Sequence, residues 1–311
     1  MKKIYLLAIL CIVITSCSTD DAKIESTISA NEKKEIFNFS SFELMNQKIN
    51  EINILKEEME KSTSQKYTTN QSILSENEIL TNLKNYHTDR LNDIYTLRKK
   101  VNFMSIESIA DEINSLKIVD PDKSNELFLK YEQFLTKNKF QITTIFKNGI
   151  GNVTNEHGKV LIDGQNIDSQ NSTARYVYDE SVKEDLAAIS SDWRFHVFYA
   201  TGREKHKDTF GKVFFRYFTE FRSYYTDFNG VTSLCPATYS VTNNSIAGFS
   251  QSGDNPFADF AFSMQYPSGN GSTIRQTSGQ IWTAYQPEGG YINASFSGAG
   301  YVITCDFKYK R

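Results

Sequence analysis

Glycine is absent from the first 148 residues of this 311-residue chain, and proline occurs there only once, at Pro121. All 16 glycines, four of the five prolines and both tryptophans come later in the chain. Because glycine and proline punctuate turns and interrupt helices, their absence over so long a stretch favours long helices. The composition therefore divides the chain into two parts that differ in secondary structure.

Histidine is scarce as well. His87, His157, His196 and His206 are the only four, no two of them lie three to five residues apart, and HExxH does not occur. The common zinc motifs are therefore missing, and we expect no metal. Phosphate-binding glycine loops and nucleophile elbows are missing too, and we expect no cofactor. A hydrolase with two catalytic carboxylates far apart in the sequence stays open, since it needs no linear motif.

The chain begins with a short basic segment, Lys2-Lys3, followed by the uninterrupted apolar run IYLLAILCIVIT at residues 4–15. At about 1.5 Å per residue, this run would be roughly 18 Å long as a helix, well short of the ~30 Å hydrocarbon core of a bilayer. A basic start and a short apolar run are typical of a secretory signal rather than a membrane-spanning helix.

The apolar run ends at a cysteine. The letters ITSC place Cys17 after one apolar and two small residues, which resembles a bacterial lipobox. This resemblance implies that residues 1–16 are removed and that Cys17 is lipidated, which would anchor the protein to a membrane. The letters STDD that follow resemble the surface-export signal of Bacteroidetes-type lipoproteins and imply the cell-surface side of the outer membrane. An ordinary signal that happens to contain Cys17 is the alternative.

Charge and cysteine content limit the partners further. The formal net charge is −3, and it becomes −5 when Lys2 and Lys3 leave with the signal. This acidic balance argues against nucleic acid as a partner. After removal of the signal and lipidation of Cys17, Cys235 and Cys305 remain. In an oxidising compartment we predict that they form a disulfide, with two buried thiols as the alternative.

The first part of the chain has the periodicity of helices. We predict a flexible tether at residues 17–35 and a helical region at 36–140. Ser40 and Ser75 are each followed three residues later by a glutamate, the pattern of a capping box. The four predicted helices begin near Ser40, Ser75, Ser105 and Ser124, Pro121 is predicted in a turn, and residues 61–74 are predicted to be a loop.

After about residue 140 the apolar period changes from 3.6 to 2. In YVITCDFKYKR at 301–311 apolar and polar residues alternate, as in a half-buried strand. Residues 193–199 place Trp193, Phe195, Val197 and Tyr199 on one face, and residues 278–300 suggest two strands joined at 287–290. We predict an α+β fold whose residues 141–311 form an antiparallel β-rich domain, a sandwich or a partial barrel.

Two stretches resemble a family. FNFSSFELMNQKINEI at 37–52 and VTNEHGKVLIDGQNI at 153–167 are similar to segments of uncharacterised Bacteroidetes-type surface lipoproteins. The resemblance implies a lipobox, an opening helix and a β-rich C-terminal half, but it carries no known activity. This chain departs from the pattern at Asp163-Gly164 and at Asn166-Ile167, where the family usually has a tyrosine. Asn155 and Gly158 tolerate the positive φ of a hairpin turn, which we predict there.

The stretch GREKHKDTFGK at 202–212 joins two aromatic-rich segments and is the best candidate for a binding patch. Its predicted binding residues are Arg203, Lys205, His206 and Lys207, which together could bind an anionic partner such as an acidic glycan. The composition favours the alternative, a solvated turn between strands. The 17 tyrosines and 22 phenylalanines could stack on sugars or could simply fill the core.

We therefore expect a lipid-anchored surface or envelope protein whose β-rich domain binds an extracellular glycan or protein, without enzymatic activity. An extracytoplasmic carbohydrate-active hydrolase and a structural or adhesive envelope component are the alternatives. An exposed aromatic row would favour glycan binding, and a pocket with paired carboxylates would favour the hydrolase. A bare sheet edge would favour assembly.

Overall fold

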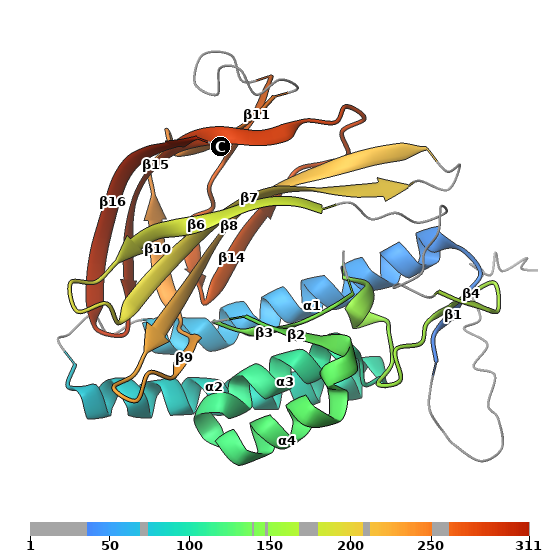
Figure 1. Ribbon diagram of the computed structural model, residues 1–311, viewed down its shortest axis with the longest axis horizontal. Coiled ribbons are helices and arrows are strands. Elements are labelled where there is room, and N and C mark those ends of the chain that lie inside the picture. The colour runs from blue at the N-terminus through green and yellow to red at the C-terminus, as the bar shows by residue number, and fades with distance from the viewer. Residues whose placement is uncertain are drawn as a thin grey trace, which may run out of the picture.

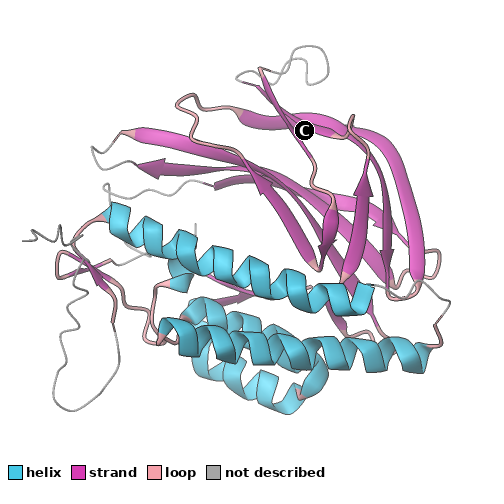
Figure 2. Cartoon of the chain, turned by 180° about the vertical axis from the view of Figure 1, so that it is seen from behind, coloured by secondary structure: helices cyan, strands magenta, loops and turns pink. Residues whose placement is uncertain are grey.

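The computed structural model describes residues 36–68, 74–138, 140–146, 149–167, 180–207, 212–250 and 261–310. The predicted signal, the tether and Cys17 lie outside these residues. Helices in the first half and antiparallel strands in the second form an α+β fold, as the periodicity predicts (Figure 1). The helices form one layer, and the curved sheets arch over it, as Figure 2 shows from behind.

In the described residues the helical layer contains two long and two shorter helices, and two short 3₁₀ turns follow them in the chain. The helices are α1 (Phe42–Thr68), α2 (Glu76–Val101), α3 (Ile106–Val119) and α4 (Pro121–Tyr131). The 3₁₀ turns are η1 (Glu132–Phe134) and η2 (Ile150–Asn152). Apolar side chains such as Met45, Ile49, Ile106 and Ile113 pack with residues of the short strands and connections in a core separate from that of the large sheets.

Capping residues set the helix starts as predicted at two places. The backbone N–H of Ser75 and its hydroxyl both donate to Glu78 Oε2, at 2.8 and 2.7 Å. Ser105 begins the third helix and accepts a hydrogen bond from the backbone N–H of Ser108 at 3.1 Å. Because such bonds satisfy N–H groups that have no partner within the helix, both starts could be predicted from the sequence.

Three boundaries differ from the prediction. Helix α1 begins at Phe42, and Ser41 rather than Ser40 accepts from a first-turn N–H. It continues through Thr68, so the loop predicted from residue 61 is wrong over residues 61–68. Contacts with α2 explain this: the Thr63 hydroxyl, on a buried side chain, donates to an Asp93 carboxylate oxygen at 2.8 Å. Helix α4 begins at Pro121, not Ser124, because Asp120 caps it and proline suits the first helical position.

Two antiparallel sheets form the β-rich half. The 5-stranded sheet has the order β14-β8-β7-β6, with β9 also paired to β8. Its strands are β6 (Glu180–Ile189), β7 (Phe195–Lys207), β8 (Val213–Thr226), β9 (Thr232–Leu234) and β14 (Thr273–Thr277).

The 6-stranded sheet has the order β12-β11-β15-β10-β13, with β16 also paired to β15. Its strands are β10 (Ala237–Val241), β11 (Ile246–Ser250), β12 (Phe262–Gln265), β13 (Gly269–Gly271), β15 (Gln286–Gly298) and β16 (Tyr301–Lys310). Side chains of both sheets share one aromatic core, where the rings of Phe221 and Phe296 lie 5.2 Å apart. The alternation predicted for 301–311 is confirmed over β16.

Short strands complete the fold. β1 (Asn38–Phe39) pairs in parallel with β4 (Leu161–Ile162), which pairs with β5 (Gln165–Asn166), and β2 (Leu135–Lys137) pairs with β3 (Ile142–Thr144). The turn predicted at Asn155 and Gly158 is confirmed, since Gly158 has a φ of 72° and its N–H donates to the Asn155 carbonyl at 2.9 Å.

The turn predicted at 287–290 is wrong, because these residues lie within the continuous strand β15. Their glycines serve close packing instead: a Cβ on Gly289 would lie 2.6 Å from the Tyr309 carbonyl oxygen, and one on Gly290 would collide with the Ile246 carbonyl. The β15–β16 turn lies at Ala299 and Gly300, whose φ angles are 50° and 77°.

Cys235 and Cys305 are free thiols in the structure, so the predicted disulfide is wrong. Cys305 lies in β16 and Cys235 lies just before β10, and β15 separates these two strands. Along β15, Ala237 is level with Gly298, whereas Cys305 is level with Ala294. This offset corresponds to about 13 Å along the strand, and Cys235 lies beyond Ala237, whereas a disulfide joins Cα atoms roughly 4–7 Å apart.

Candidate functional site

The β7–β8 hairpin does not present its predicted charges on a common surface. Arg203 is 9% exposed, and its Nη1 donates to the Tyr285 carbonyl at 2.9 Å. His206 is 8% exposed and stacks on the ring of Phe214, with centroids 5.2 Å apart. Adjacent strand residues alternate between faces, so these two side chains point to opposite sides of the sheet.

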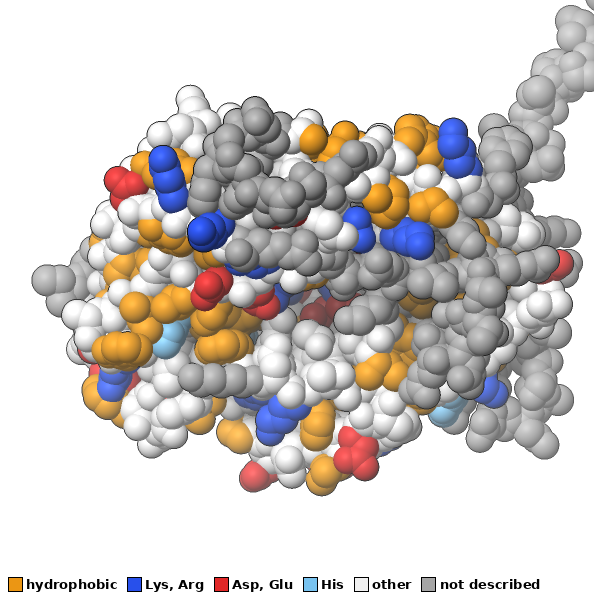
Figure 3. All heavy atoms as spheres, turned by 45° about the horizontal axis from the view of Figure 1, so that its top comes forward, with side chains coloured by type: hydrophobic (Ala, Val, Ile, Leu, Met, Phe, Trp, Pro, Cys, Tyr) orange, Lys and Arg blue, Asp and Glu red, His pale blue; other side chains and the backbone are white. Residues whose placement is uncertain are grey.

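The other two predicted patch residues, Lys205 and Lys207, do not complete a basic surface. Lys205 is half-buried and pairs with Phe215 in the β7–β8 ladder, and the side chain of Lys207 lies outside the described part of the chain. On the face in view in Figure 3, basic side chains are interspersed with acidic and apolar ones and form no continuous basic surface over the described residues.

The face of the 5-stranded sheet that carries His206 also carries paired charges, which the linear sequence does not reveal. Arg275 bonds to Glu204, its Nη1 lies 3.6 Å from a Glu220 carboxylate oxygen, and its guanidinium lies 3.6 Å from the centroid of the Phe218 ring. Arg222 pairs with Glu220 from the other side. Burial raises the pKa of Glu204, but the hydrogen bond to His206 and the charge of Arg275 outweigh it, so the net pKa shift is downward.

These glutamates are therefore engaged by cations. General acid catalysis needs a carboxyl group that stays protonated near neutral pH, and in Glu204 the local charges favour the ionised form. The arrangement supports a structural role for this charged face more than a hydrolytic one.

A more accessible feature is the turn between β6 and β7. Trp193 has a φ of 64° and its side chain is 72% exposed. Ser190 holds the turn: its carbonyl accepts from the Trp193 N–H at 2.9 Å, and its hydroxyl accepts from the N–H groups of Arg194 and Phe195 at 3.1 and 2.9 Å. The prediction that Trp193 shares one strand face with Phe195 is wrong, since the strand begins only at Phe195.

The turn between β8 and β9 lies beside it and carries a second exposed ring. Phe228 is 71% exposed, and the Arg194 guanidinium lies 3.1 Å from its ring centroid. The backbone ties the turns together, because the Thr226 N–H donates to the Arg194 carbonyl at 2.8 Å. We call Trp193, Arg194 and Phe228 the aromatic tip.

Contacts with the helical layer orient the aromatic tip. Arg194 Nη1 lies 2.7 Å from Glu76 Oε2 in the first turn of α2, and the Tyr225 hydroxyl donates to the same oxygen at 2.8 Å. The Tyr301 hydroxyl, just after the β15–β16 turn, donates to Asp192. Three segments far apart in the sequence therefore hold the two turns that carry the exposed rings.

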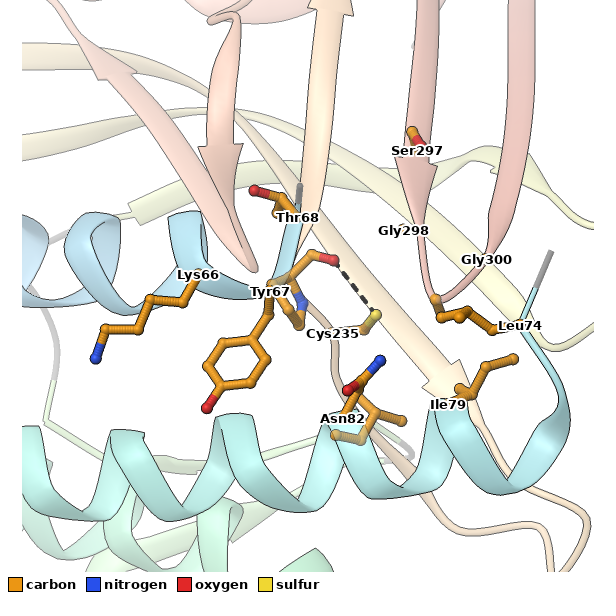
Figure 4. Close-up of a pocket in the computed structure, with 13 residues that line it drawn as sticks. Lys66, Tyr67, Thr68, Leu74, Ile79, Asn82, Cys235, Ser297, Gly298 and Gly300 are labelled. Atoms are coloured by element: carbon orange, nitrogen blue, oxygen red, sulfur yellow. Dashed lines mark hydrogen bonds between the residues drawn. The ribbon is translucent and has the colours of Figure 1, made fainter. Parts of the chain in front are cut away.

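A pocket opens at the same end of the molecule, where α1 ends, α2 begins and β15 turns into β16 (Figure 4). Its cavity volume is about 60 Å³, far below that of a site that encloses a whole small ligand, so it has room only for a small substituent. Burial raises the pKa of Cys235 to about 12, so its thiol is neutral, and the Sγ lies 3.5 Å from the Pro236 carbonyl oxygen. Besides Cys235, the residues that line the pocket include Leu74, Ile79, Asn82, Leu83, Ser297 and Gly300.

Neither metal ligands nor a membrane-spanning helix occur in the described ranges. No three histidine, cysteine, aspartate or glutamate side chains gather there as a metal site would require. None of the helices described is long and apolar enough to cross a bilayer.

A scan of the chain against protein-family models gives no match, and neither does a search of curated proteins. A search of solved structures finds the crystal structure of a DUF4848 family protein from Bacteroides thetaiotaomicron, at 10% sequence identity and a TM-score of 0.23. The alignment covers 88% of this chain and 97% of that one. A TM-score this low supports no inference, so the function is argued from the residues of this chain.

Proposed function

We propose that this protein is a binding module of the cell envelope that holds a glycan at the aromatic tip. The observation that carries the proposal is Trp193, a large ring that is 72% exposed on a backbone with positive φ. A left-handed conformation costs a residue with a Cβ about 1–2 kcal/mol, and strain of this kind clusters at functional sites. An exposed ring recovers little of that cost by packing, so binding is the better explanation.

The chemistry of the aromatic tip suits a sugar. The apolar face of a pyranose ring stacks on an aromatic side chain, and an aromatic body with a polar edge suits a surface that is partly wet. Arg194 covers one face of Phe228 and is itself fixed by Glu76, so this ring is held in place before a ligand arrives. Such preorganisation lowers the entropy cost of binding.

The proposal includes a lipid anchor at Cys17 and a position on the outer surface of the outer membrane. Its support is the signal-like run at 4–15, the lipobox-like letters before Cys17 and the acidic stretch after it. Resemblance of residues 37–52 and 153–167 to uncharacterised Bacteroidetes-type surface lipoproteins points the same way. Intact mass spectrometry of protein from native membranes tests this part: loss of residues 1–16 with acyl chains on Cys17 supports it, and an unlipidated chain overturns it.

Glycan binding is tested with two tryptophan variants of the full-length protein in detergent. Trp282 is the matched control, because it is 47% exposed and contacts Phe214, at the opposite end of β8 from the aromatic tip. A glycan array first identifies ligands, and calorimetry then compares the variants. We expect Trp193→Ala to weaken binding about tenfold or more, since an aromatic contact of this kind is lost, and Trp282→Ala to leave it unchanged.

Two results would contradict the proposal. If no glycan binds the wild-type protein, the proposed ligand class is wrong. If Trp193→Ala and Trp282→Ala bind equally well, the aromatic tip is not the site.

A further inference from the structure

The aromatic tip and the pocket share two segments of the chain. At the start of α2, Leu74 and Ile79 line the pocket, and Glu76 between them holds Arg194. At the β15–β16 turn, residues 298–300 line the pocket, and Tyr301 directly after them bonds to Asp192. A ligand stacked on the aromatic tip therefore lies beside segments that also form the pocket wall.

The pocket wall combines aliphatic side chains with a larger polar surface. Leu74, Ile79, Leu83 and Pro236 supply apolar surface, and the buried Cys235 thiol stays protonated. Lys66 also lines the pocket, but its Nζ lies 3.3 Å from an Asp89 carboxylate oxygen, and in Figure 4 its side chain points away from Cys235. An anionic group would thus gain little here, whereas a small neutral group with both an apolar and a polar part would be accommodated.

The shape of the wall also favours a small group. Gly300 has a φ of 77°, and a Cβ there would lie 3.5 Å from the Leu74 Cβ and 3.8 Å from Ile79 Cδ1. The lack of a side chain at this turn leaves room beside these two residues. One neutral polar group borders the same space: in Figure 4 the Asn82 amide points from α2 towards Cys235. A side-chain amide can both donate and accept a hydrogen bond.

We infer that the glycan carries an acyl group on nitrogen and that the pocket receives this group. An acetamido substituent has an apolar methyl, which fits the aliphatic wall, and an amide, which can pair with Asn82. The ligand class is therefore N-acylated amino sugars. This inference rests on the proposed function, since the sugar ring itself is held by the aromatic tip.

The inference is tested with two oligosaccharides that differ only in the acetamido group. The tetramers of β1,4-linked N-acetylglucosamine and of β1,4-linked glucose share a backbone and differ at the acetamido position. Calorimetry with the full-length protein should show at least tenfold tighter binding of the N-acetylated tetramer. Equal affinity for the two would overturn this inference and leave glycan binding intact, whereas failure of every glycan to bind would overturn both.

A pair of variants tests the pocket itself. Asn82 and Asn85 are both exposed on α2, but only Asn82 lines the pocket. Asn82→Trp should obstruct the opening and reduce the preference for the N-acetylated tetramer at least fivefold, with little change in affinity for the glucose tetramer. Asn85→Trp should keep the full preference. If Asn82→Trp keeps it as well, the pocket does not receive the acyl group.

Discussion

At the residue scale, the most informative side chain is Trp193, because a large aromatic residue rarely combines a positive φ with an exposed ring. Residues with a large side chain rarely adopt a φ of 64°, and a ring that is 72% exposed contributes little to the core. The turn nevertheless keeps this geometry through three hydrogen bonds to Ser190. Stability and binding should therefore respond in opposite directions to substitution here.

This opposition can be measured with two substitutions of Trp193. Glycine adopts positive φ without a steric cost, whereas alanine keeps the Cβ, so Trp193→Gly should be about 1 kcal/mol more stable than Trp193→Ala. Urea denaturation at equilibrium gives the difference, and both variants should bind the glycan about tenfold or more weakly than the wild-type protein. Equal stability of the two variants would show that the left-handed backbone is not strained in solution.

At the element scale, helix α1 shows how a single cap decides a boundary. The sequence favours Ser40, because Glu43 follows three residues later, but the helix begins at Phe42. The Leu44 N–H donates to the Ser41 hydroxyl at 3.3 Å, so the neighbouring serine is the cap. The strand pair just before it explains the shift, since Phe39 lies opposite Ile162 in the β1–β4 ladder.

Adjacent serines make this boundary easy to test. Removing an N-cap hydroxyl typically costs about 1 kcal/mol, so Ser41→Ala should lower the free energy of unfolding by roughly that amount. Ser40→Ala, one residue earlier and exposed, should have an effect close to zero. Thermal or urea unfolding compares them directly, and the reverse order of stabilities would restore Ser40 as the cap.

At the scale of the whole molecule, buried polar contacts join the helical layer to the sheets. His87 of α2 is 2% exposed, and its Nε2 lies 3.0 Å from the Leu234 carbonyl oxygen of β9. The Ser272 hydroxyl, between β13 and β14, donates to Glu60 of α1. Burial lowers the pKa of His87 to about 4, so this histidine is neutral in the folded protein near neutral pH.

The burial of His87 predicts how the free energy of unfolding depends on pH. The unfolded chain takes up a proton on His87 below its ordinary pKa of about 6.5, whereas the folded protein does so only near pH 4. Stability is therefore unaffected above pH 6.5 and falls as the pH drops from 6.5 towards 4. Between pH 8 and pH 5 this one group should remove about 2 kcal/mol.

Two histidine variants isolate this contribution. In urea unfolding, His87→Gln should lose about 2 kcal/mol less free energy of unfolding between pH 8 and pH 5 than the wild-type protein does. This difference is expected even if the variant is less stable at every pH. His157→Gln changes a histidine whose side chain is 40% exposed and should keep the loss seen in the wild-type protein. If His87→Gln and the wild-type protein lose the same free energy between pH 8 and pH 5, His87 is not buried as a neutral group.

The sequence by itself determined the features that depend on local chemistry. The α+β class followed from where glycine and proline occur and from the change of period near residue 140. The caps at Ser75 and Ser105 and the turn at Asn155 followed from side chains that bond to nearby backbone. The alternation of β16 followed from the two faces of a strand.

Only the tertiary structure decided what depends on which segments become neighbours. Strand register separates Cys235 from Cys305, and burial on opposite faces separates Arg203 from His206. The candidate site combines the start of α2 with turns near residues 193, 228 and 300, and no local pattern relates these positions. Contacts between distant segments arise from packing, which a linear pattern does not encode.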